Sequence, residues 1–357
     1  MNGSVIVKIA LVSPLYEAVP PKLYGGTERI VAYLADALVE LGHEVTLFAS
    51  GDAKTKAKLV AVRDQALRLD PAPLKSDVAA HLSMLHTVRR RARSFDVIHF
   101  HIDPLQYPMF EDYAGRTLTT MHGRLDLKDL PEMYRLYPRY PLVSISNNQR
   151  KPLAFANWAG TVYHGLPNGL LQFSPRGGDY LAFLGRISPE KRPDRAIEIA
   201  RRVGMKLKIA AKVDAADRDY YTHKIEPMID GHEVEYIGEI SEAQKSAFLG
   251  NAAALLFPID WPEPFGLVMI EAMACGTPVV AWNCGSVPEV IDNDVTGFVV
   301  SSEDEAVAAI RCLDELDRAQ VRRVFDKRFS ADVMARNYTT IYRRLAVRDV
   351  DDLMQPA

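Results

Sequence analysis

The strongest constraint on the fold is an alternation of short apolar runs with longer segments of helical spacing, which occurs in each half of the chain. In the first half, the run Val5–Ser13 leads into a glycine-bearing loop. Apolar residues then recur every three or four positions as far as Leu41, and a second apolar run occupies residues 44–49. Strand, loop, helix and strand in this order predict a βαβ unit and therefore a parallel sheet.

The second half repeats the alternation after a connector. Residues 166–180 contain proline and glycine with little periodicity, which is typical of a link between domains. Ser241 and Gln244 then predict a capping box at the start of one helix. Further apolar runs occupy residues 180–184, 206–213, 234–238, 254–258 and 278–281. We predict an α/β fold with two Rossmann-like, doubly wound parallel-sheet domains, residues 1–168 and 169–329, that face each other across a cleft.

Composition narrows the possible partners and compartments. The formal net charge of -3 gives no general attraction to nucleic acid, and the basic run Arg89–Arg93 is typical of a solvated helix face. Three widely spaced cysteines form no C-x-x-C pair, which fits a reducing cytoplasm. No segment has the length and apolarity of a membrane span, so any membrane contact would be peripheral. We predict a cytoplasmic protein that binds no nucleic acid.

Residues just after the predicted strands are the first site candidates, because open parallel sheets bind ligands at the carboxyl ends of their strands. Gly25 and Gly26 stand at a predicted helix start, where backbone N–H groups could approach an anion; a turn that needs glycine for its geometry explains them equally well. Arg186 ends a predicted strand, and Lys191 follows at a predicted helix start. Two such cations could clamp a diphosphate, although taken alone they fit ordinary surface residues better.

A helix predicted over residues 265–275 places a carboxylate on its apolar face. Leu267 and Glu271 lie on one stripe of this helix, so Glu271 points inward and needs a partner. Either ribose hydroxyls of a ligand or a hydrogen bond to the backbone could be the partner of Glu271. Glu263 precedes the helix, whose start could offer N–H groups to an anion or a sugar. The residues at that start are Phe265, Gly266 and Leu267.

Histidines and acid pairs are further candidates. His122 directly follows a predicted strand, residues 117–121, and could bind a sugar hydroxyl or assist proton transfer, although a lone histidine is more often structural. His99, His101 and Asp103 resemble metal ligands, but nothing supplies a second ligand group, so we predict no metal site.

Three Asp-x-Asp pairs, at residues 217–219, 292–294 and 349–351, are interpreted as solvated acids because they lie in polar stretches. The phosphate charge would then fall to Arg186, Lys191 and helix ends. The sequence has no G-x-G-x-x-G, Walker A or G-x-S-x-G pattern, which weighs against dehydrogenases, kinases and hydrolases.

Three motifs in order resemble those of family 4 of the retaining glycosyltransferases. They are GGTER at residues 25–29, LGRISPEK at residues 184–191, and Glu263 with Glu271 as E-x7-E. The resemblance spans nearly the whole chain. It implies a GT-B fold, with the C-terminal helix 330–357 returning to the first domain. It also implies transfer of a hexose from a UDP- or GDP-sugar to a hydroxyl of a small molecule, glycan or lipid-linked acceptor, with no metal and no cofactor.

The resemblance also assigns roles to residues. Arg186 and Lys191 would bind the donor diphosphate, Glu271 the ribose, and Glu263 with the backbone of residues 265–267 the transferred sugar. Gly25 and Gly26 would lie near the phosphate, and His122 near the sugar. Retention implies attack from the face of the leaving phosphate, which acts as the base. The segment 163–167 (YHGLP) departs from the Asn-Gly common in the family and leaves the hinge there unassigned.

Two other functions share this architecture. A nucleotide-sugar epimerase would process the donor without any acceptor, and a silent binding module would bind the donor without turnover. The acceptor is expected against the longer loops, residues 13–23 and 122–140, because loops carry the specificity that shared motifs do not.

Overall fold

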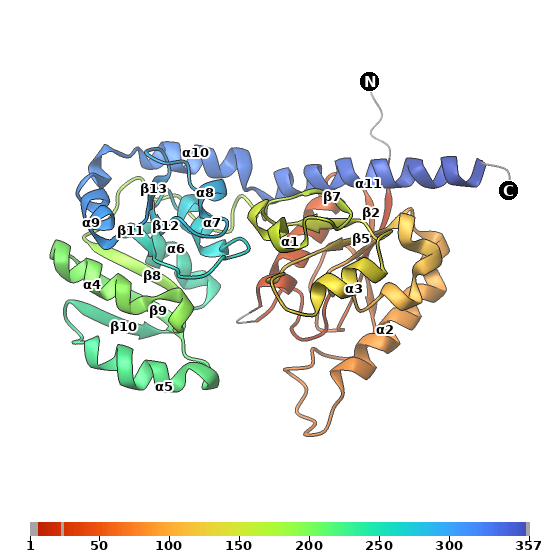
Figure 1. The fold of residues 1–357 in the computed structure, drawn as a ribbon, viewed down its shortest axis with the longest axis horizontal. Coiled ribbons are helices and arrows are strands. Elements are labelled where there is room, and N and C mark those ends of the chain that lie inside the picture. Colours follow the sequence, from red (N-terminus) through yellow and green to blue (C-terminus); the bar gives the residue numbers. More distant parts are fainter. Residues whose placement is uncertain (1–5, 23–24, 355–357) are drawn as a thin grey trace. The chain divides into compact units, whose positions relative to one another are not determined.

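The computed structural model describes residues 6–22 and 25–354, with side chains as far as residue 346. The chain divides into two compact units, residues 1–167 with 331–357, and residues 168–330 (Figure 1). Each of these boundaries lies one residue from the predicted one. Parts of three predictions fall outside the described residues: Val5 of the first strand, Leu23 of an acceptor loop, and the end of the last helix, 355–357.

The first unit is built on a parallel sheet with the strand order β3-β2-β1-β4-β5-β6-β7. All four residues of β4 are buried, as expected of a central strand covered on both faces. The predicted Rossmann-like first domain is therefore confirmed. Its strands are β1 (Lys8–Val12), β2 (Glu44–Ala49), β3 (Lys58–Ala61), β4 (Val97–Phe100), β5 (Thr117–Thr120), β6 (Leu142–Ser144) and β7 (Trp158–Thr161).

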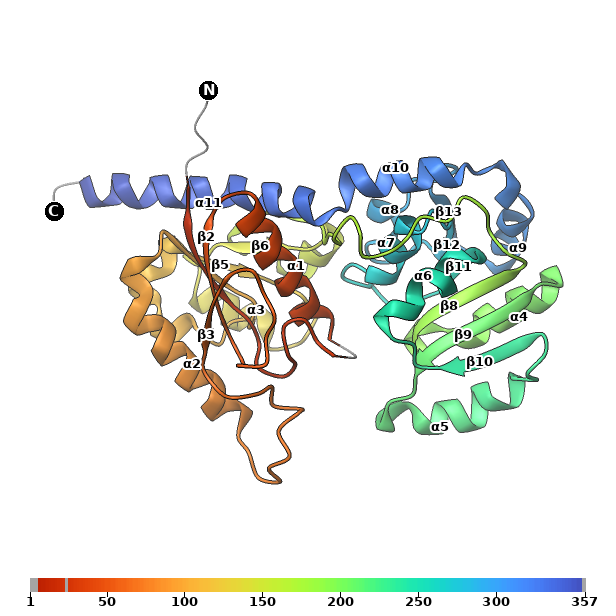
Figure 2. The ribbon, with the colours of Figure 1, turned by 180° about the vertical axis from the view of Figure 1, so that it is seen from behind.

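The last helix completes the first unit. Its helices are α1 (Gly26–Glu40), α2 (Asp77–Arg91), α3 (Leu130–Leu136) and α11 (Ala331–Met354). Helix α11 packs against α1 and β4, and Figures 1 and 2 show it alongside the sheet. Tyr338 and Tyr342 are fully buried on its inner face. The terminal helix thus belongs to the first unit, as the resemblance implies.

The second unit repeats the plan with the strand order β10-β9-β8-β11-β12-β13, again all parallel. A separate hydrophobic core, with Leu181, Ile197 and Ile209 among its buried residues, fills it. The predicted second Rossmann-like domain is confirmed. Its strands are β8 (Tyr180–Arg186), β9 (Lys206–Lys212), β10 (Val234–Gly238), β11 (Ala252–Phe257), β12 (Val279–Trp282) and β13 (Gly297–Val300).

The helices of the second unit differ in detail from the prediction. They are α4 (Pro193–Val203), α5 (Arg218–Tyr220), α6 (Glu242–Gly250), α7 (Leu267–Ala274), α8 (Val287–Val290), α9 (Glu303–Arg311) and α10 (Arg318–Arg328). The helix predicted after Pro189 is α4, but it starts only at Pro193, because residues 189–191 form a 3-10 turn and Arg192 adopts a left-handed conformation. The capping box of Ser241 and Gln244 is confirmed. Within the described part of the chain, no helix is both long and apolar enough to cross a membrane.

Candidate functional site

In the second unit, the predicted cations lie at the carboxyl edge of the sheet. Arg186 is the last residue of β8, and Lys191 ends the turn that follows it. The loop after β11 carries Glu263, whose carboxylate forms an ion pair with the Lys191 ammonium. Phe257 and Trp261 flank the same ammonium, with ring centroids 5.6 and 5.2 Å away. The structure therefore brings Lys191 and Glu263 together from motifs 72 residues apart.

Three carboxylates surround Arg186. Glu190 pairs with its guanidinium from the adjoining turn. The other two follow β9: an Asp214 oxygen lies 3.7 Å and an Asp217 oxygen 3.5 Å from guanidinium nitrogens. Burial raises the pKa of Asp217, and the charges of the other two acids add to that rise against the pull of Arg186. A diphosphate bound at Arg186 would compete with these carboxylates.

The interpretation of all three Asp-x-Asp pairs as solvated acids was therefore wrong in part. Asp217 is half-buried and interacts with Arg186 because the loop after β9 ends beside the end of β8. Asp292 pairs with Arg328. Side chains at residues 349–351 lie outside the described part of the chain. No three His, Cys, Asp or Glu side chains within that part are grouped as metal ligands.

Glu271 is buried on α7, as its stripe predicts, and its partner is a lysine. A carboxylate oxygen of Glu271 lies 2.7 Å from the Lys245 ammonium on α6, while the Glu271 side chain is only 4% exposed. Glu242, one turn earlier on α6, lies 3.4 Å from the same ammonium. From the sequence we expected ribose hydroxyls or a backbone hydrogen bond as the partner of Glu271, and this ion pair was not predicted. Because one oxygen of Glu271 engages Lys245, the carboxylate is held in place before any ligand binds.

Glycine sets the start of α7. Gly266 has a φ of 79°, and a Cβ there would lie 2.9 Å from the Met269 side chain and 3.0 Å from that of Phe257. Phe265 is buried, and its carbonyl accepts a hydrogen bond from the Ser286 hydroxyl. Helix α7 then begins at Leu267, so the amides of its first turn lie at the same edge as Glu263.

The glycine pair of the first unit is needed for its backbone geometry. Gly25 has a φ of 152°, and a Cβ there would lie 2.9 Å from Pro21 and 3.2 Å from Glu17. Gly26 is the first residue of α1. Glu28, buried in the first turn of that helix, accepts a hydrogen bond from the Glu17 amide. The loop after β1 is thus folded back on the start of α1, and a phosphate role for the two glycines stays a prediction.

At the carboxyl edge of the first sheet, His122 belongs to a row of four imidazoles. Neighbouring ring centroids in the order His99, His101, His122 and His164 are 4.1, 5.1 and 5.3 Å apart. His101 follows β4, His122 follows β5 and His164 follows β7. Burial lowers the pKa of all four rings, that of His122 to about 3, so the row is uncharged at neutral pH. An uncharged row can hydrogen-bond hydroxyl groups but offers no charge to a phosphate.

His99 is a structural residue. Its two ring nitrogens lie 2.7 Å from the hydroxyls of Tyr342 and Thr120, and the whole side chain is buried. His99 and His101 do share one face of the sheet, as alternation predicts. Both nitrogens of His99 are engaged by hydroxyls rather than left for a ligand.

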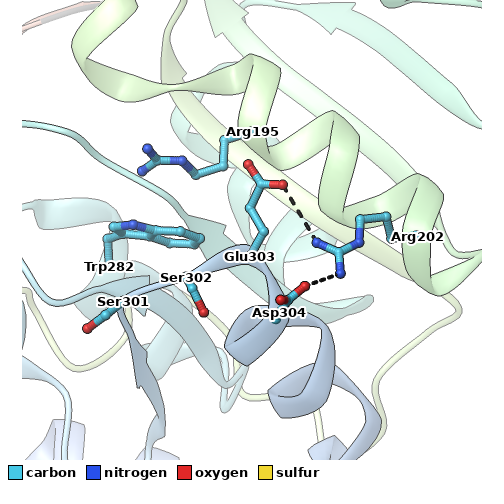
Figure 3. Close-up of a pocket in the computed structure, with 7 residues that line it drawn as sticks. All are labelled: Arg195, Arg202, Trp282, Ser301, Ser302, Glu303 and Asp304. Atoms are coloured by element: carbon cyan, nitrogen blue, oxygen red, sulfur yellow. Dashed lines mark hydrogen bonds and ion pairs between the residues drawn. The ribbon is translucent and has the colours of Figure 1, made fainter.

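A hollow of about 380 Å³ lies elsewhere on the second unit, between α4 and the start of α9 (Figure 3). The Arg195 guanidinium stands over the Trp282 ring at 4.4 Å, and Arg202 pairs with Glu303 and Asp304. None of the sequence-predicted site residues lines this hollow. Its charged side chains neutralise one another, so it is not the site that the motifs describe.

Comparisons with known proteins agree with this geometry. The model of Glycosyltransferase Family 4 matches residues 24–162, and the model of Glycosyl transferases group 1 matches residues 172–327. A phosphatidyl-myo-inositol mannosyltransferase of Mycolicibacterium smegmatis is 25% identical over 368 residues, which cover 94% of this chain and 91% of the relative.

Solved structures show the same fold. AviGT4, a glycosyltransferase involved in avilamycin A biosynthesis, has a TM-score of 0.70 at 25% identity, covering 96% of this chain and 98% of that one. Anabaena HepE in complex with UDP and glucose has a TM-score of 0.72 at 17% identity, covering 94% and 98%. The two parallel-sheet domains and these similarities establish the GT-B fold.

Proposed function

The chain belongs to family 4 of the glycosyltransferases, and on that premise we propose that it transfers a hexose from a UDP- or GDP-sugar to an acceptor hydroxyl, with retention and without a metal. The single observation that carries the proposal is the convergence of Arg186, Lys191 and Glu263 at one sheet edge, beside the start of α7. A cation pair and a helix start are what a diphosphate requires, and a carboxylate beside them can accept hydrogen bonds from sugar hydroxyls.

The reaction breaks the bond between the sugar C1 and the diphosphate oxygen and forms a bond from C1 to the acceptor oxygen. Negative charge develops on the departing diphosphate, where Arg186 and Lys191 would stabilise it. The acceptor hydroxyl gives its proton to an oxygen of that phosphate, which accounts for attack from the same face. Glu263, held by Lys191, would orient the sugar, while Glu271 would accept hydrogen bonds from the ribose.

The donor class is supported by the relatives. HepE was solved with UDP and glucose, which favours a uridine diphosphate donor and a hexose. The mannosyltransferase similarity also favours a hexose. The proposal of metal independence rests on Arg186 and Lys191, because two fixed cations can neutralise a diphosphate.

The acceptor belongs to the first unit in this proposal. His122 would hydrogen-bond a substrate hydroxyl, as the uncharged row permits. The phosphatidyl-myo-inositol mannosyltransferase acts, by its name, on a phospholipid with a polyol head group, which supports a polyol, glycan or lipid-linked acceptor for this chain.

A thermal-shift titration with UDP, GDP and ADP, each with and without a chelator, tests the donor site. A ligand at ~100 times its dissociation constant stabilises the folded protein by about 2.7 kcal/mol. We expect UDP or GDP to raise the melting temperature equally with and without chelator, and Arg186→Ala to abolish the shift. Arg202→Ala removes an arginine from the same unit outside the site and should leave the shift intact. A shift that requires a divalent ion would refute metal independence.

Incubation with donor alone separates transfer from epimerisation. A transferase consumes the nucleotide sugar substantially only when an acceptor is present, whereas an epimerase converts it unaided. Proton NMR of the anomeric region reads both outcomes, and a product whose anomeric configuration matches the donor supports retention. Donor binding with no turnover across a set of inositol, glycan and lipid acceptors would favour a silent binding module.

A further inference from the structure

His101 is the hydrogen-bond partner of His122. Nδ1 of His101 lies 2.8 Å from Nε2 of His122, and His101 itself is 3% exposed. The two rings follow neighbouring parallel strands, β4 and β5, which places them side by side at the sheet edge. His122 is only half-buried, and within the described residues no group hydrogen-bonds its Nδ1. That nitrogen is therefore the one that a ligand can reach.

Two proton arrangements satisfy this hydrogen bond when both rings are neutral, because a neutral imidazole carries one N–H. In the first, His101 donates from Nδ1, and His122 must carry its own proton on Nδ1. In the second, His122 donates from Nε2, and His101 must carry its proton on Nε2.

The burial of His101 distinguishes the two arrangements. Its Nε2 is buried and has no hydrogen-bond partner within the described part of the chain. The second arrangement would leave an N–H there without an acceptor, and orphaned buried N–H groups are rarer in folded proteins than under-satisfied acceptors. The first arrangement leaves only an unpaired acceptor, the lone pair of His101 Nε2, at that position.

We propose that His101 is a positioning residue that donates its Nδ1 proton to Nε2 of His122, so that His122 presents an N–H at Nδ1 to a substrate oxygen. The inference rests on the proposed function for the role of His122, but not for its protonation. His99 supports the arrangement from the other side. Its ring lies 4.1 Å from that of His101 and is fixed by the Tyr342 and Thr120 hydroxyls, so His101 has little room to rotate.

Nitrogen-15 NMR of histidine-labelled protein without substrate tests the proton position directly. Long-range proton–nitrogen spectra distinguish the two neutral forms of imidazole, and His122→Gln identifies the His122 signals by their loss. We expect the His122 proton on Nδ1. Finding it on Nε2 would overturn the proposal, whatever the enzyme does.

A matched pair of variants tests the consequence for catalysis. In His101→Asn, the side-chain amide can donate a hydrogen bond from near the position of Nδ1, whereas in His101→Asp the carboxylate only accepts. We expect His101→Asn to keep the His122 proton on Nδ1 and to retain kcat/KM within about threefold. We expect His101→Asp to move the proton to Nε2 and to lower kcat/KM by about 10- to 100-fold, as loss of a residue that fixes a histidine tautomer does at metal sites.

The melting temperature of both variants serves as the folding control. Equal activity of the Asn and Asp variants, with the proton moved only in the second, would show that the tautomer does not matter to transfer. If His122→Gln itself leaves transfer unchanged, the role of His122 in the proposed function fails, while the NMR result on His101 still stands.

Discussion

In the first unit, the side chains that follow β4, β5 and β7 are neutral imidazoles; in the second, those that follow β8, β9 and β11 are charged and paired. Both edges belong to parallel sheets of the same general topology. The backbone thus provides the location in each unit, and the side chains alone decide what each location can bind.

The two edges also differ in how they avoid the energetic cost of burying an unpaired charge. A buried histidine can lose its proton, and burial lowers the pKa of His99 and His101 well below the ordinary value of a histidine. Arginine cannot lose its proton at any ordinary pH, so Arg186 is balanced by carboxylates instead. If the edge of the second unit binds phosphate, as proposed, it has to remain charged, and it therefore needs counter-charges when no ligand is present.

The buried pair Lys245–Glu271 should give the largest effect on stability. Lys245→Met removes the cation and leaves a carboxylate that is 4% exposed, so the free energy of unfolding should fall by about 3–5 kcal/mol. Urea unfolding measures it. Adding Glu271→Met replaces the pair by apolar groups and should recover most of the loss. A single variant as stable as the natural protein would show that the pair contributes nothing.

Arg186 should give the largest effect on catalysis. Arg186→Ala should lower turnover by about two to three powers of ten, as losing one preorganised donor does elsewhere. Initial rates at saturating donor measure the effect, with Arg202→Ala as the control. Unchanged turnover would remove Arg186 from the mechanism and would leave this residue with a structural role only.

Acid should weaken the first unit before the second. The unfolded chain protonates its histidines near pH 6.5, whereas the folded row stays neutral until far lower pH, with a pKa of about 3 for His122. The unfolded state therefore binds more protons below pH 6.5. As the pH falls below that value, the free energy of unfolding decreases by about 1.4 kcal/mol per pH unit for each histidine.

The tryptophans allow that loss to be assigned to a unit. Trp158 lies in the first unit, and Trp261 and Trp282 lie in the second. Variants that keep tryptophan in only one unit should therefore show the urea midpoint of the first unit moving between pH 7.5 and 5.5. Equal shifts in both units would contradict the contrast between the two edges.

Asp217 should give the smallest effect, and its sign is informative. Asp217→Asn removes one carboxylate that, in the proposed function, would compete with a diphosphate for Arg186, and partly exposed ion pairs of this kind contribute up to about 1 kcal/mol. UDP or GDP should then bind up to about fivefold more tightly by calorimetry. Asp219→Asn, an exposed neighbour, is the control. Weaker binding in Asp217→Asn would mean that this carboxylate positions Arg186 instead of competing for it.

Local patterns predicted most of the fold. Apolar runs, helical spacing and punctuating glycines are properties of consecutive residues, and they located both sheets and the division between the units. The predicted helix after Pro189 starts only at Pro193 because Arg192 adopts a left-handed conformation, and no sequence pattern predicts that conformation for an arginine.

The site was predictable only where residues lie beside the end of a strand or the start of a helix. Arg186 and His122 were predicted because they end or follow a strand, and Glu263 because it precedes a helix start; their roles stay predictions. Lys245 and Asp217 were missed because their partners come from other elements, and pairing between elements depends on strand order rather than on spacing. His164 follows β7, a strand whose sequence WAGT has too little apolar character to be predicted.

Helix α11 has a consequence for the order of synthesis. The first unit needs Tyr342 to complete the hydrogen bonds of His99, yet a ribosome makes the entire second unit before that tyrosine. During synthesis, buried polar groups of the first unit therefore lack their hydrogen-bond partners on α11 until the chain is nearly finished. The second unit, by contrast, is one continuous stretch of chain and can fold as soon as it is made. Truncation of α11 would consequently destabilise the first unit, although most of that unit is synthesised first, and would leave the second unit intact.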